Sequence, residues 1–551
     1  MDSAVDHDEH LYHGNEVIQQ PRPSTDPNDP LNWAKWRKYL NLTLACLYCI
    51  FVWTDINIVT VTWGPMNDGD DLKNGFSYDY LNDSYASGCA ALAIGSPLLI
   101  PFALKYGRRP VYVLSTLAQF AIAVWTAKLQ TKGDLMAVNT LNCLFGSLAE
   151  VIVQMTVADV FFVHERGRMN SWYQWALAFG NLANIAGGYV TVNQGWRWVW
   201  WWMAIFFGIS FIVYVFLFEE TKFCHVYNGV DPIDLQDPIA VNSTTDGKPV
   251  LSDSKTQEAT SASEERNHPH DVTVNPIAVN HHIYNVRIDQ SIPLKSYRSR
   301  LALWSTSRSS LRGLFRHSFQ PLMVWATIPS VFYFTLAYSI TGSTQTIMIT
   351  VLSEYLYDPP YNFTSAGVGL MSIPGFIGGS LGLLICGPLS DWGILYLAKK
   401  NKGIYEPEMR LWVIAAFVPF VPAGLLMFGI GLANGNSWPI LAVGSGILAF
   451  GLSPANSIAL TYLTDSYTNI IADTMVGITI IRNLVALTFV FSISPWVDGI
   501  GITNVYIMLA VLNTVILLSV VGFIYFGKRI RVHTAKSYAY YGQRQVDARA
   551  I

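Results

Sequence analysis

Three ionisable side chains lie inside long apolar stretches of this sequence: Asp55, Glu150 and Arg482. A charge at the centre of a membrane helix costs about 2.5–3.5 kcal/mol, so it is kept where it has a function or a partner. Loss of water favours the neutral form of a carboxylate, which lets a buried Asp or Glu exchange protons near neutral pH. The ionised form attracts cations. Asp55 and Glu150 are therefore candidates for proton coupling or cation binding, unless one of them pairs with Arg482.

Amide and phenol side chains accompany these charges. Gln154 is four residues after Glu150, and Gln174, Asn181 and Asn184 follow the spacing of one helix face. Such a lining, with aromatic rings beside it, would suit an organic cation. The alternative for each amide is a hydrogen bond between helices, worth about 0.6 kcal/mol on average. The predicted polar lining consists of Asn57, Gln154, Gln174, Asn181, Asn184, Tyr338, Gln345 and Asn456.

The composition indicates which elements position these groups. Of 551 residues, 51% are hydrophobic and 13% are charged, against about 25% charged residues in soluble domains. About 20 apolar residues cross the hydrocarbon core of a bilayer. The sequence therefore predicts an all-α membrane protein with twelve transmembrane helices in two six-helix bundles. The predicted spans are 38–62, 84–104, 109–128, 135–163, 172–192, 197–218, 319–351, 364–388, 409–433, 437–463, 471–496 and 503–527.

Basic residues gather in the loops on one side of the predicted bundles. Lys105 follows span two, Lys399 follows span eight and Lys528 follows span twelve, whereas the opposite loops hold few basic residues. By the positive-inside rule, this side is cytoplasmic and so are both termini. The same orientation places the sequons at Asn82 and Asn362 outside, as possible N-glycosylation sites.

The chain divides into five predicted regions. The centre is rich in Ser, Thr, Asn and Asp and cannot bury enough apolar surface to fold alone. From Lys295 to Arg316 it is basic, which predicts either a helix lying on an anionic leaflet or an ordinary basic flank. The regions are a cytoplasmic tail (1–36), a six-helix bundle (37–220), a largely disordered cytoplasmic linker (221–318), a second six-helix bundle (319–528) and a cytoplasmic tail (529–551).

Small and charged residues recur in two loops on the basic side, one after the second span and one after the eighth. Small residues allow helices to approach closely, and charges at helix ends can latch a gate. The alternative is that these charges only set the orientation of the helices. The candidate gating residues are Lys105, Gly107, Arg108, Arg109, Gly387 and Asp391.

These two loops resemble the G-x-x-x-D-R-x-G-R-R motif of the major facilitator superfamily. The first loop keeps Gly-Arg-Arg but has Leu104 at the aspartate position, and the second keeps the Gly and the Asp. Other segments resemble a fungal branch, the drug:proton antiporters that include histidinol- and polyamine-type carriers. These segments are Asp29–Trp33, Asp159–Gly167, Gly195–Trp198 and Glu406–Leu411.

Two positions depart from the antiporter pattern. The fifth-span motif G-x-x-x-G-P-x-x-G-G ends in Gly187-Gly188, but Ala183 and Asn184 occupy its Gly-Pro positions. The fourth-span motif carries an arginine four residues before a glycine, and this sequence has Asn142 at that position. Both departures weaken the inference of proton-driven efflux.

The resemblance implies a secondary active transporter that works by alternating access between two bundles. The expected substrate is an organic cation (polyamine-like), a drug or a metabolite, and the expected energy source is a proton gradient. The sequence has no phosphate-binding loop, nucleophile elbow or zinc-protease motif. We therefore expect no enzyme activity, no cofactor or metal, and no nucleic-acid partner. We expect a monomer in the plasma membrane, with the vacuolar membrane as the alternative. Uptake and efflux both fit the sequence, and a second hypothesis is a non-transporting sensor on the same fold.

Overall fold

The computed structural model describes residues 12–13, 16–17, 24, 26–69, 75–223, 292–302, 304, 318–401, 406–467, 470–542 and 544. Two compact units divide the chain. In the unit formed by Met1–Ile18 and Cys224–Ile288, the described residues are the antiparallel pair β1 (Tyr12–His13) and β2 (Glu16–Val17). All described helices belong to the other unit. Most of the predicted linker, including residues 224–291 and 305–317, lies outside the described residues.

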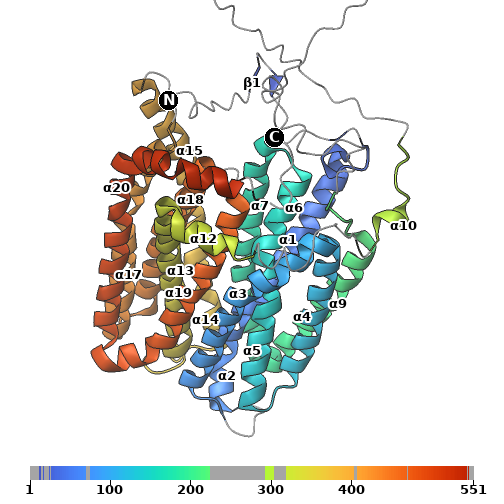
Figure 1. The fold of residues 1–551 in the computed structure, drawn as a ribbon. Helices are drawn as coiled ribbons and strands as arrows, with labels where there is room; N and C mark the ends of the chain where they lie inside the picture. Colours follow the sequence, from blue (N-terminus) through green and yellow to red (C-terminus); the bar gives the residue numbers. More distant parts are fainter. Residues whose placement is uncertain are drawn as a thin grey trace, which may run out of the picture. The chain divides into compact units, whose positions relative to one another are not determined.

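Helices dominate both halves of the second unit (Figure 1). The first half contains η1 (Pro30–Asn32), α1 (Lys35–Ile58), η2 (Val59–Thr62), α2 (Trp63–Asp68), α3 (Tyr78–Tyr106), α4 (Arg108–Ala127), α5 (Lys132–Gly146), α6 (Leu148–Val160), α7 (Val163–Leu182), α8 (Asn184–Gln194) and α9 (Trp196–Leu217). The second half contains α12 (Gln320–Thr327), α13 (Pro329–Tyr355), α14 (Ser365–Leu370), α15 (Ser372–Lys400), η4 (Pro407–Val413), α16 (Ile414–Phe417), α17 (Phe420–Ala433), α18 (Trp438–Ser466), α19 (Ile471–Ile500) and α20 (Ile502–Gly542). The short α10 (Tyr297–Arg300) belongs to the described part of the linker.

Local sequence explains where these helices begin and turn. Gly107 has a φ of 105° and Gly195 a φ of 91°, so each lets the chain reverse between two helices where other residues would be strained. At the start of α5, the Thr131 hydroxyl accepts from the Asp134 amide, and the Asp134 carboxylate accepts from the Thr131 amide. This capping box satisfies backbone groups that the first turn leaves without partners.

Ten helical segments of the described chain are long and apolar enough to cross a membrane. An eleventh is the pair α12 and α13, which bends by 103° at its break. The remaining predicted span, 172–192, corresponds to α7 and α8, which are separated at Ala183. Its polar stripe lowers its hydropathy, and a polar face is expected where a membrane helix borders an internal cavity.

The C-terminal part of α20 extends into the predicted tail, 529–551. The helix continues to Gly542 and crosses the end of the second half (Figure 1). Tyr538 packs against Tyr467 with ring centroids 5.8 Å apart, and the Tyr541 hydroxyl lies 3.2 Å from Thr327 Oγ1. This extension is too polar to be recognised as a membrane span. The contacts of Tyr538 and Tyr541 hold it in place as a helix, and hydropathy does not predict such contacts.

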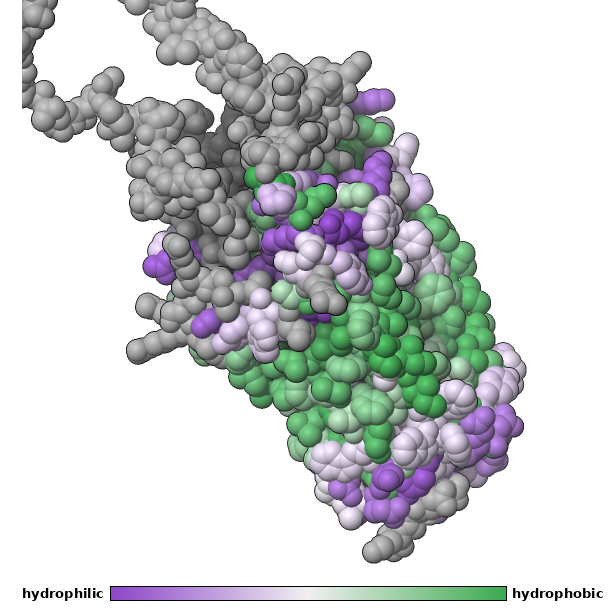
Figure 2. Space-filling model, turned by 90° about the vertical axis from the view of Figure 1, so that its right-hand side faces the viewer, coloured by the Kyte–Doolittle hydropathy of each residue, from purple (hydrophilic) through white to green (hydrophobic). Residues whose placement is uncertain are grey.

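On the face shown in Figure 2, a broad apolar band lies between two hydrophilic ends. On α9, the exposed side chains Ile205, Ile209, Ile212 and Phe216 are spaced along one helix face. Exposed apolar surface of this extent would be unstable in water, but it matches the hydrocarbon core of a bilayer. The arrangement is that of a multi-pass membrane protein. We call the end that holds Arg108 and Lys528 the basic end, and the other the opposite end.

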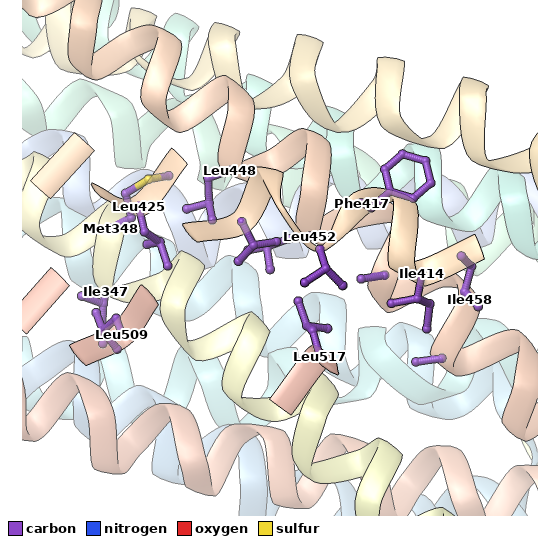
Figure 3. Close-up of a cluster of buried hydrophobic side chains, with 14 of the residues drawn as sticks. Ile347, Met348, Ile414, Phe417, Leu425, Leu448, Leu452, Ile458, Leu509 and Leu517 are labelled. Carbon is purple, nitrogen blue, oxygen red and sulfur yellow. The ribbon is translucent and has the colours of Figure 1, made fainter. Parts of the chain in front are cut away.

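Each half has its own core. In the second half, aliphatic side chains such as Leu425, Leu448 and Leu509 meet at the centre (Figure 3). In the first half, the rings of Tyr48 and Tyr112 meet edge to face at 4.9 Å. Each half is therefore packed around its own hydrophobic cluster.

The two halves contact each other mainly through α3 with α19 and α8 with α14. At the opposite end, the Tyr357 hydroxyl donates to the Val61 carbonyl at 2.6 Å. A Cβ atom added to Gly188 on α8 would lie 2.9 Å from the Ala366 Cα atom, so the helices touch by their backbones there. These contacts close the opposite end between the halves.

Candidate functional site

A small cavity lies between the two halves. Its volume is about 50 Å³. Helices of the first half contribute Glu150 and Gln154 from α6, and α19 of the second half contributes Arg482. The complete lining is Trp53, Glu150, Gln154, Tyr173, Gln174, Leu177, Tyr338, Leu460, Met475, Ile478, Thr479 and Arg482.

An ion pair crosses this cavity from one half to the other. The Arg482 guanidinium donates through Nη2 to Glu150 Oε1. Asn483 Nδ2 donates to the second oxygen of Glu150 at 3.2 Å, and its own oxygen accepts from Arg482 at 3.1 Å. Side-chain exposure is 5% for Glu150 and 22% for Arg482. Removing one partner of a buried pair leaves an uncompensated charge and costs about 3–5 kcal/mol.

Aromatic rings frame the pair. The Arg482 guanidinium carbon lies 5.8 Å from the centroid of the Trp53 ring. Tyr173 lines the cavity from α7, and its hydroxyl donates to the Glu150 backbone carbonyl at 3.4 Å. Tyr338 lines it from α13. A carboxylate within aromatic rings provides both the charge and the π faces that bind an organic cation.

Five of the predicted residues are brought together in this cavity: Glu150, Arg482, Gln154, Gln174 and Tyr338. The alternative that one acid pairs with Arg482 applies to Glu150. Sequence reasoning did not select Trp53, Tyr173 or Asn483. Asn483 follows a membrane-embedded arginine directly, which is a usable signal, whereas the two aromatic residues cannot be told from ordinary membrane aromatics.

The other predicted lining residues lie outside the cavity lining. Asn57 donates to the Trp53 carbonyl at 2.7 Å, and Asn456 accepts from Thr341 Oγ1 at 2.7 Å. Asn184 packs where α8 meets α14, since a Cβ on Gly369 would reach its carbonyl. Asp55 is 1% exposed inside the first half. The residues Asn181 and Gln345 are half-buried in α7 and α13 and do not line the cavity.

Charged groups link helix ends at the basic end of the first half. Arg108 pairs with Asp159 at 2.9 Å. The Glu220 carboxylate accepts from the backbone amides of Arg108 and Arg109 at 2.9 and 3.1 Å, where the start of α4 favours a negative charge. Arg109 Nε donates to the Phe218 carbonyl at 2.8 Å, next to the end of α9. Burial raises the pKa of the Glu220 carboxyl, against the opposing effect of these amide donors.

The second half has two comparable charged contacts at its basic end. In one of them the acid and the base are on exchanged helices. Arg410 pairs with Asp465 at 3.2 Å, as Arg108 does with Asp159. At the second contact, the base Arg531 lies on α20 and the acid Glu408 lies on η4, 2.8 Å apart. In the first half the acid Glu220 follows α9 and meets the start of α4. The two halves therefore have related charged contacts between helix ends, which we call latches, and these are made from different residues.

The predicted gating residues share the basic end but do not all join these latches. The Lys105 ammonium lies 5.5 Å from the Tyr106 ring centroid. Gly107 provides the turn between α3 and α4. Gly387 has open space where a Cβ would project, and Asp391 is exposed on α15. The Asp391 carboxylate therefore does not take the role of the aspartate that is Leu104 in the first loop. The carboxylate at the start of α4 is that of Glu220.

The two sequons differ in access. Asn82 is 3% exposed and donates through Nδ2 to Ser494 Oγ at 3.2 Å, across the contact of α3 with α19. A glycan on that nitrogen would break the contact. Asn362 is exposed, with a φ of 46°, on the turn before α14.

Comparison with known proteins agrees with this architecture. The model of the Major Facilitator Superfamily matches residues 44–418. An MFS-type transporter of Schizosaccharomyces pombe is 34% identical over 95% of this chain and 89% of its own length. Protein HOL1 of Saccharomyces cerevisiae is 31% identical over 95% of this chain and 91% of its length. The MFS antiporter QDR3 of Candida albicans is 23% identical, covering 84% and 74%.

Among solved structures, the xylose transporter XylE from E. coli, in a partially occluded inward-open conformation, has the same fold. The match has a TM-score of 0.54 at 12% identity and covers 89% of this chain and 98% of that chain. The family model covers more than half of the chain, and the paired helical halves and charged loops agree with it. This multi-pass membrane protein belongs to the Major Facilitator Superfamily of transporters.

Proposed function

We propose that the protein is a secondary active transporter of a small organic cation, such as a polyamine-like compound, a cationic drug or a metabolite. Glu150 is the main binding charge, and protons are the coupling ion. The observation that carries the proposal is the Glu150–Arg482 pair, which joins the halves across an aromatic-lined cavity. We place the protein in the plasma membrane, and the distribution of basic residues orients its basic end toward the cytoplasm.

The arrangement supports competition at Glu150. Arg482 donates to this carboxylate and lies against Trp53, so it makes the contacts that a substrate cation would need. An incoming cation replaces Arg482, and a proton on Glu150 also releases it. Each event removes a bond between the halves and leaves them free to rock. Arg482 thereby keeps the carboxylate neutralised when no substrate is bound.

The size of the cavity fits this sequence of events. A site for a drug-sized ligand usually measures about 300–1,000 Å³, whereas this cavity measures about 50 Å³. The substrate must therefore enter as the Glu150–Arg482 pair opens and the halves separate. A narrow cavity crossed by the Glu150–Arg482 ion pair suits the substrate-free carrier as it changes from one orientation to the other.

Transport in cells and proteoliposomes tests the proposal. Uptake, and efflux from preloaded vesicles, are measured for labelled organic cations and for neutral and anionic analogues at several pH values. We expect cation flux that responds to the pH gradient and falls at least tenfold in Glu150→Gln. Asp498→Asn is the control, because Asp498 is an exposed acid outside the cavity lining. Equal flux of cations and anions, or full flux in Glu150→Gln, would refute the role of Glu150. Flux that persists after the proton gradient is collapsed would refute the coupling.

A further inference from the structure

Helix α20 is longer than a membrane span requires. At 1.5 Å per residue, its stretch from Ile502 to Phe526 rises about 37 Å, which is enough for a hydrocarbon core of about 30 Å. Near the end of this stretch, the exposed Tyr525 ring lies 6.4 Å from the exposed Trp412 ring of η4, measured between centroids. Aromatic rings of this kind are enriched at the level of the lipid headgroups. The helix therefore leaves the hydrocarbon near Tyr525.

One face of α20 stays exposed on both sides of this exit. Before the exit, its exposed side chains are apolar and follow the three- and four-residue spacing of one helix face: Val511, Val515, Leu518, Val521 and Tyr525. The same spacing continues beyond the exit through four further exposed side chains: Arg529, Val532, Lys536 and Tyr540. The face that meets the acyl chains therefore becomes basic where the headgroups begin.

The protein itself covers the other face of α20 after Phe526. A Cβ atom added to Gly527 would lie 2.8 Å from Glu408 Cγ, and Arg531 pairs with the Glu408 carboxylate at 2.8 Å. Farther along, Thr534 and Tyr541 are buried where the extension crosses the end of the second half (Figure 1). These contacts fix which face is covered, so the basic face points away from the protein.

A hollow opens on the basic face directly after the exit. Its volume is about 430 Å³, within the range of about 300–1,000 Å³ that is usual for small-ligand sites. Lys528 at this hollow pairs with Glu406 at 2.7 Å, whereas no ion pair of the described chain includes Arg529. The Arg529 guanidinium, 6.0 Å from the Phe526 ring centroid, is therefore available to an anion. The lining of this site, which we call the α20 hollow, consists of Lys528, Arg529, Val532 and His533.

The surroundings of the α20 hollow decide which anion it would take. Guanidinium and ammonium groups donate strongly to phosphate oxygens. A soluble phosphate would use the hollow alone, whereas a phospholipid also lays its acyl chains along the apolar part of the same face, beside Val521 and Tyr525. Anionic phospholipids give the cytoplasmic leaflet its negative surface potential, and the basic residues orient this end toward that leaflet.

We propose that the α20 hollow binds the headgroup of one anionic phospholipid of the cytoplasmic leaflet. Arg529 is its main donor, and Lys528 and His533 flank it. The bound lipid holds the exit of α20 at the membrane surface, next to the contact of Arg531 with Glu408. This binding does not depend on the proposed transport function.

The test measures lipid binding to the purified full-length protein in detergent. Phosphatidylserine, phosphatidylcholine and inorganic phosphate are added separately. Native mass spectrometry counts the bound lipids, and thermal unfolding gives the midpoint. We expect one phosphatidylserine to be retained beyond the number of phosphatidylcholines. The midpoint should rise by a few degrees with phosphatidylserine alone, because a bound ligand stabilises the folded state by mass action.

Two variants locate the binding. Arg529→Gln should weaken phosphatidylserine binding at least threefold and remove the rise in the midpoint. Lys132→Gln is the matched control, because Lys132 is also an exposed base beside an aromatic ring, 5.3 Å from the Tyr80 centroid. It lies at the start of α5, at the opposite end, so its loss removes the same charge and should leave the binding unchanged.

Each other outcome overturns the proposal. Equal effects of phosphatidylcholine and phosphatidylserine would mean that only apolar contacts bind lipid. An equal rise with inorganic phosphate would mean a site for soluble anions. Equal losses in Arg529→Gln and Lys132→Gln would reflect net charge rather than the α20 hollow. If Arg529→Gln does not fold, the comparison of the two lipids on the parent protein decides.

Discussion

At the scale of single residues, membrane burial made the charged sites predictable. A lone acid or base in an apolar segment is costly wherever it occurs, so Glu150 and Arg482 are evident in the sequence. Their pairing is not, because nothing local links residues so far apart in the chain.

The buried ion pair makes a prediction about stability. Glu150→Gln leaves Arg482 without its partner, so the free energy of unfolding should fall by about 3–5 kcal/mol. Replacing both residues, Glu150→Gln with Arg482→Gln, should recover most of this loss because no buried charge remains. Unfolding in detergent measures the stability of the three variants. Transport should stay lost in the double variant. Recovery of both stability and transport would mean that the pair is only structural.

Glu220 makes a prediction about pH. Burial raises its pKa in the folded protein above the usual value of 4.5. The folded state therefore binds this proton more tightly than the unfolded state does. The contribution is fully present below the unfolded pKa and is lost as pH rises through the folded pKa. Unfolding midpoints measured across this range should fall with rising pH, and Glu220→Gln should flatten the slope. An unchanged slope in that variant would assign the dependence to other groups.

At the scale of elements, hydropathy located the spans better than it located their breaks. The predicted span 135–163 is two helices, α5 and α6, that meet at Ser147. Both parts are equally apolar, so hydropathy does not show the junction. The bend between α12 and α13 and the extension of α20 also depend on contacts between helices. Helix α7 borders the cavity through Tyr173, Gln174 and Leu177, but of the predicted polar stripe Gln174 alone is in the lining.

The contact of α8 with α14 makes a prediction about closure. Gly188→Ala adds a methyl group where the backbones of Ser365 and Ala366 leave no room, so the opposite end should open more often. Spin labels at Asn193 on α8 and at Asp358, in the connection that precedes α14, report the separation of the halves at this end by pulsed electron resonance. The variant should add a population with longer distances.

Gly375→Ala is the matched control for this experiment. Gly375 lies on α15 of the second half, and a Cβ there meets nothing within 4 Å. The control should therefore reproduce the parent distance distribution. Identical distributions for Gly188→Ala and Gly375→Ala would show that backbone contact at α8 does not hold the opposite end closed.

At the scale of the whole molecule, charge and hydropathy are sufficient to predict two six-helix halves. Hydropathy is a property of a single span and charge of a single loop. The division into two halves can therefore be predicted from the sequence. The pairing of the halves depends on the contacts of α3 with α19 and of α8 with α14, together with the Glu150–Arg482 ion pair. The exchange of acid and base between the Glu220 contact and the Arg531 contact could not be predicted either, because the two halves use different residues at this position.

The most direct test asks whether water reaches the Glu150 cavity from both faces of the membrane. Gln154→Cys places a thiol in the cavity lining, next to the ion pair. A membrane-impermeant maleimide is applied to right-side-out and to inside-out vesicles, with and without an organic cation. The account predicts labelling from both faces and protection by the cation. Labelling from one face only, under every condition, would contradict it.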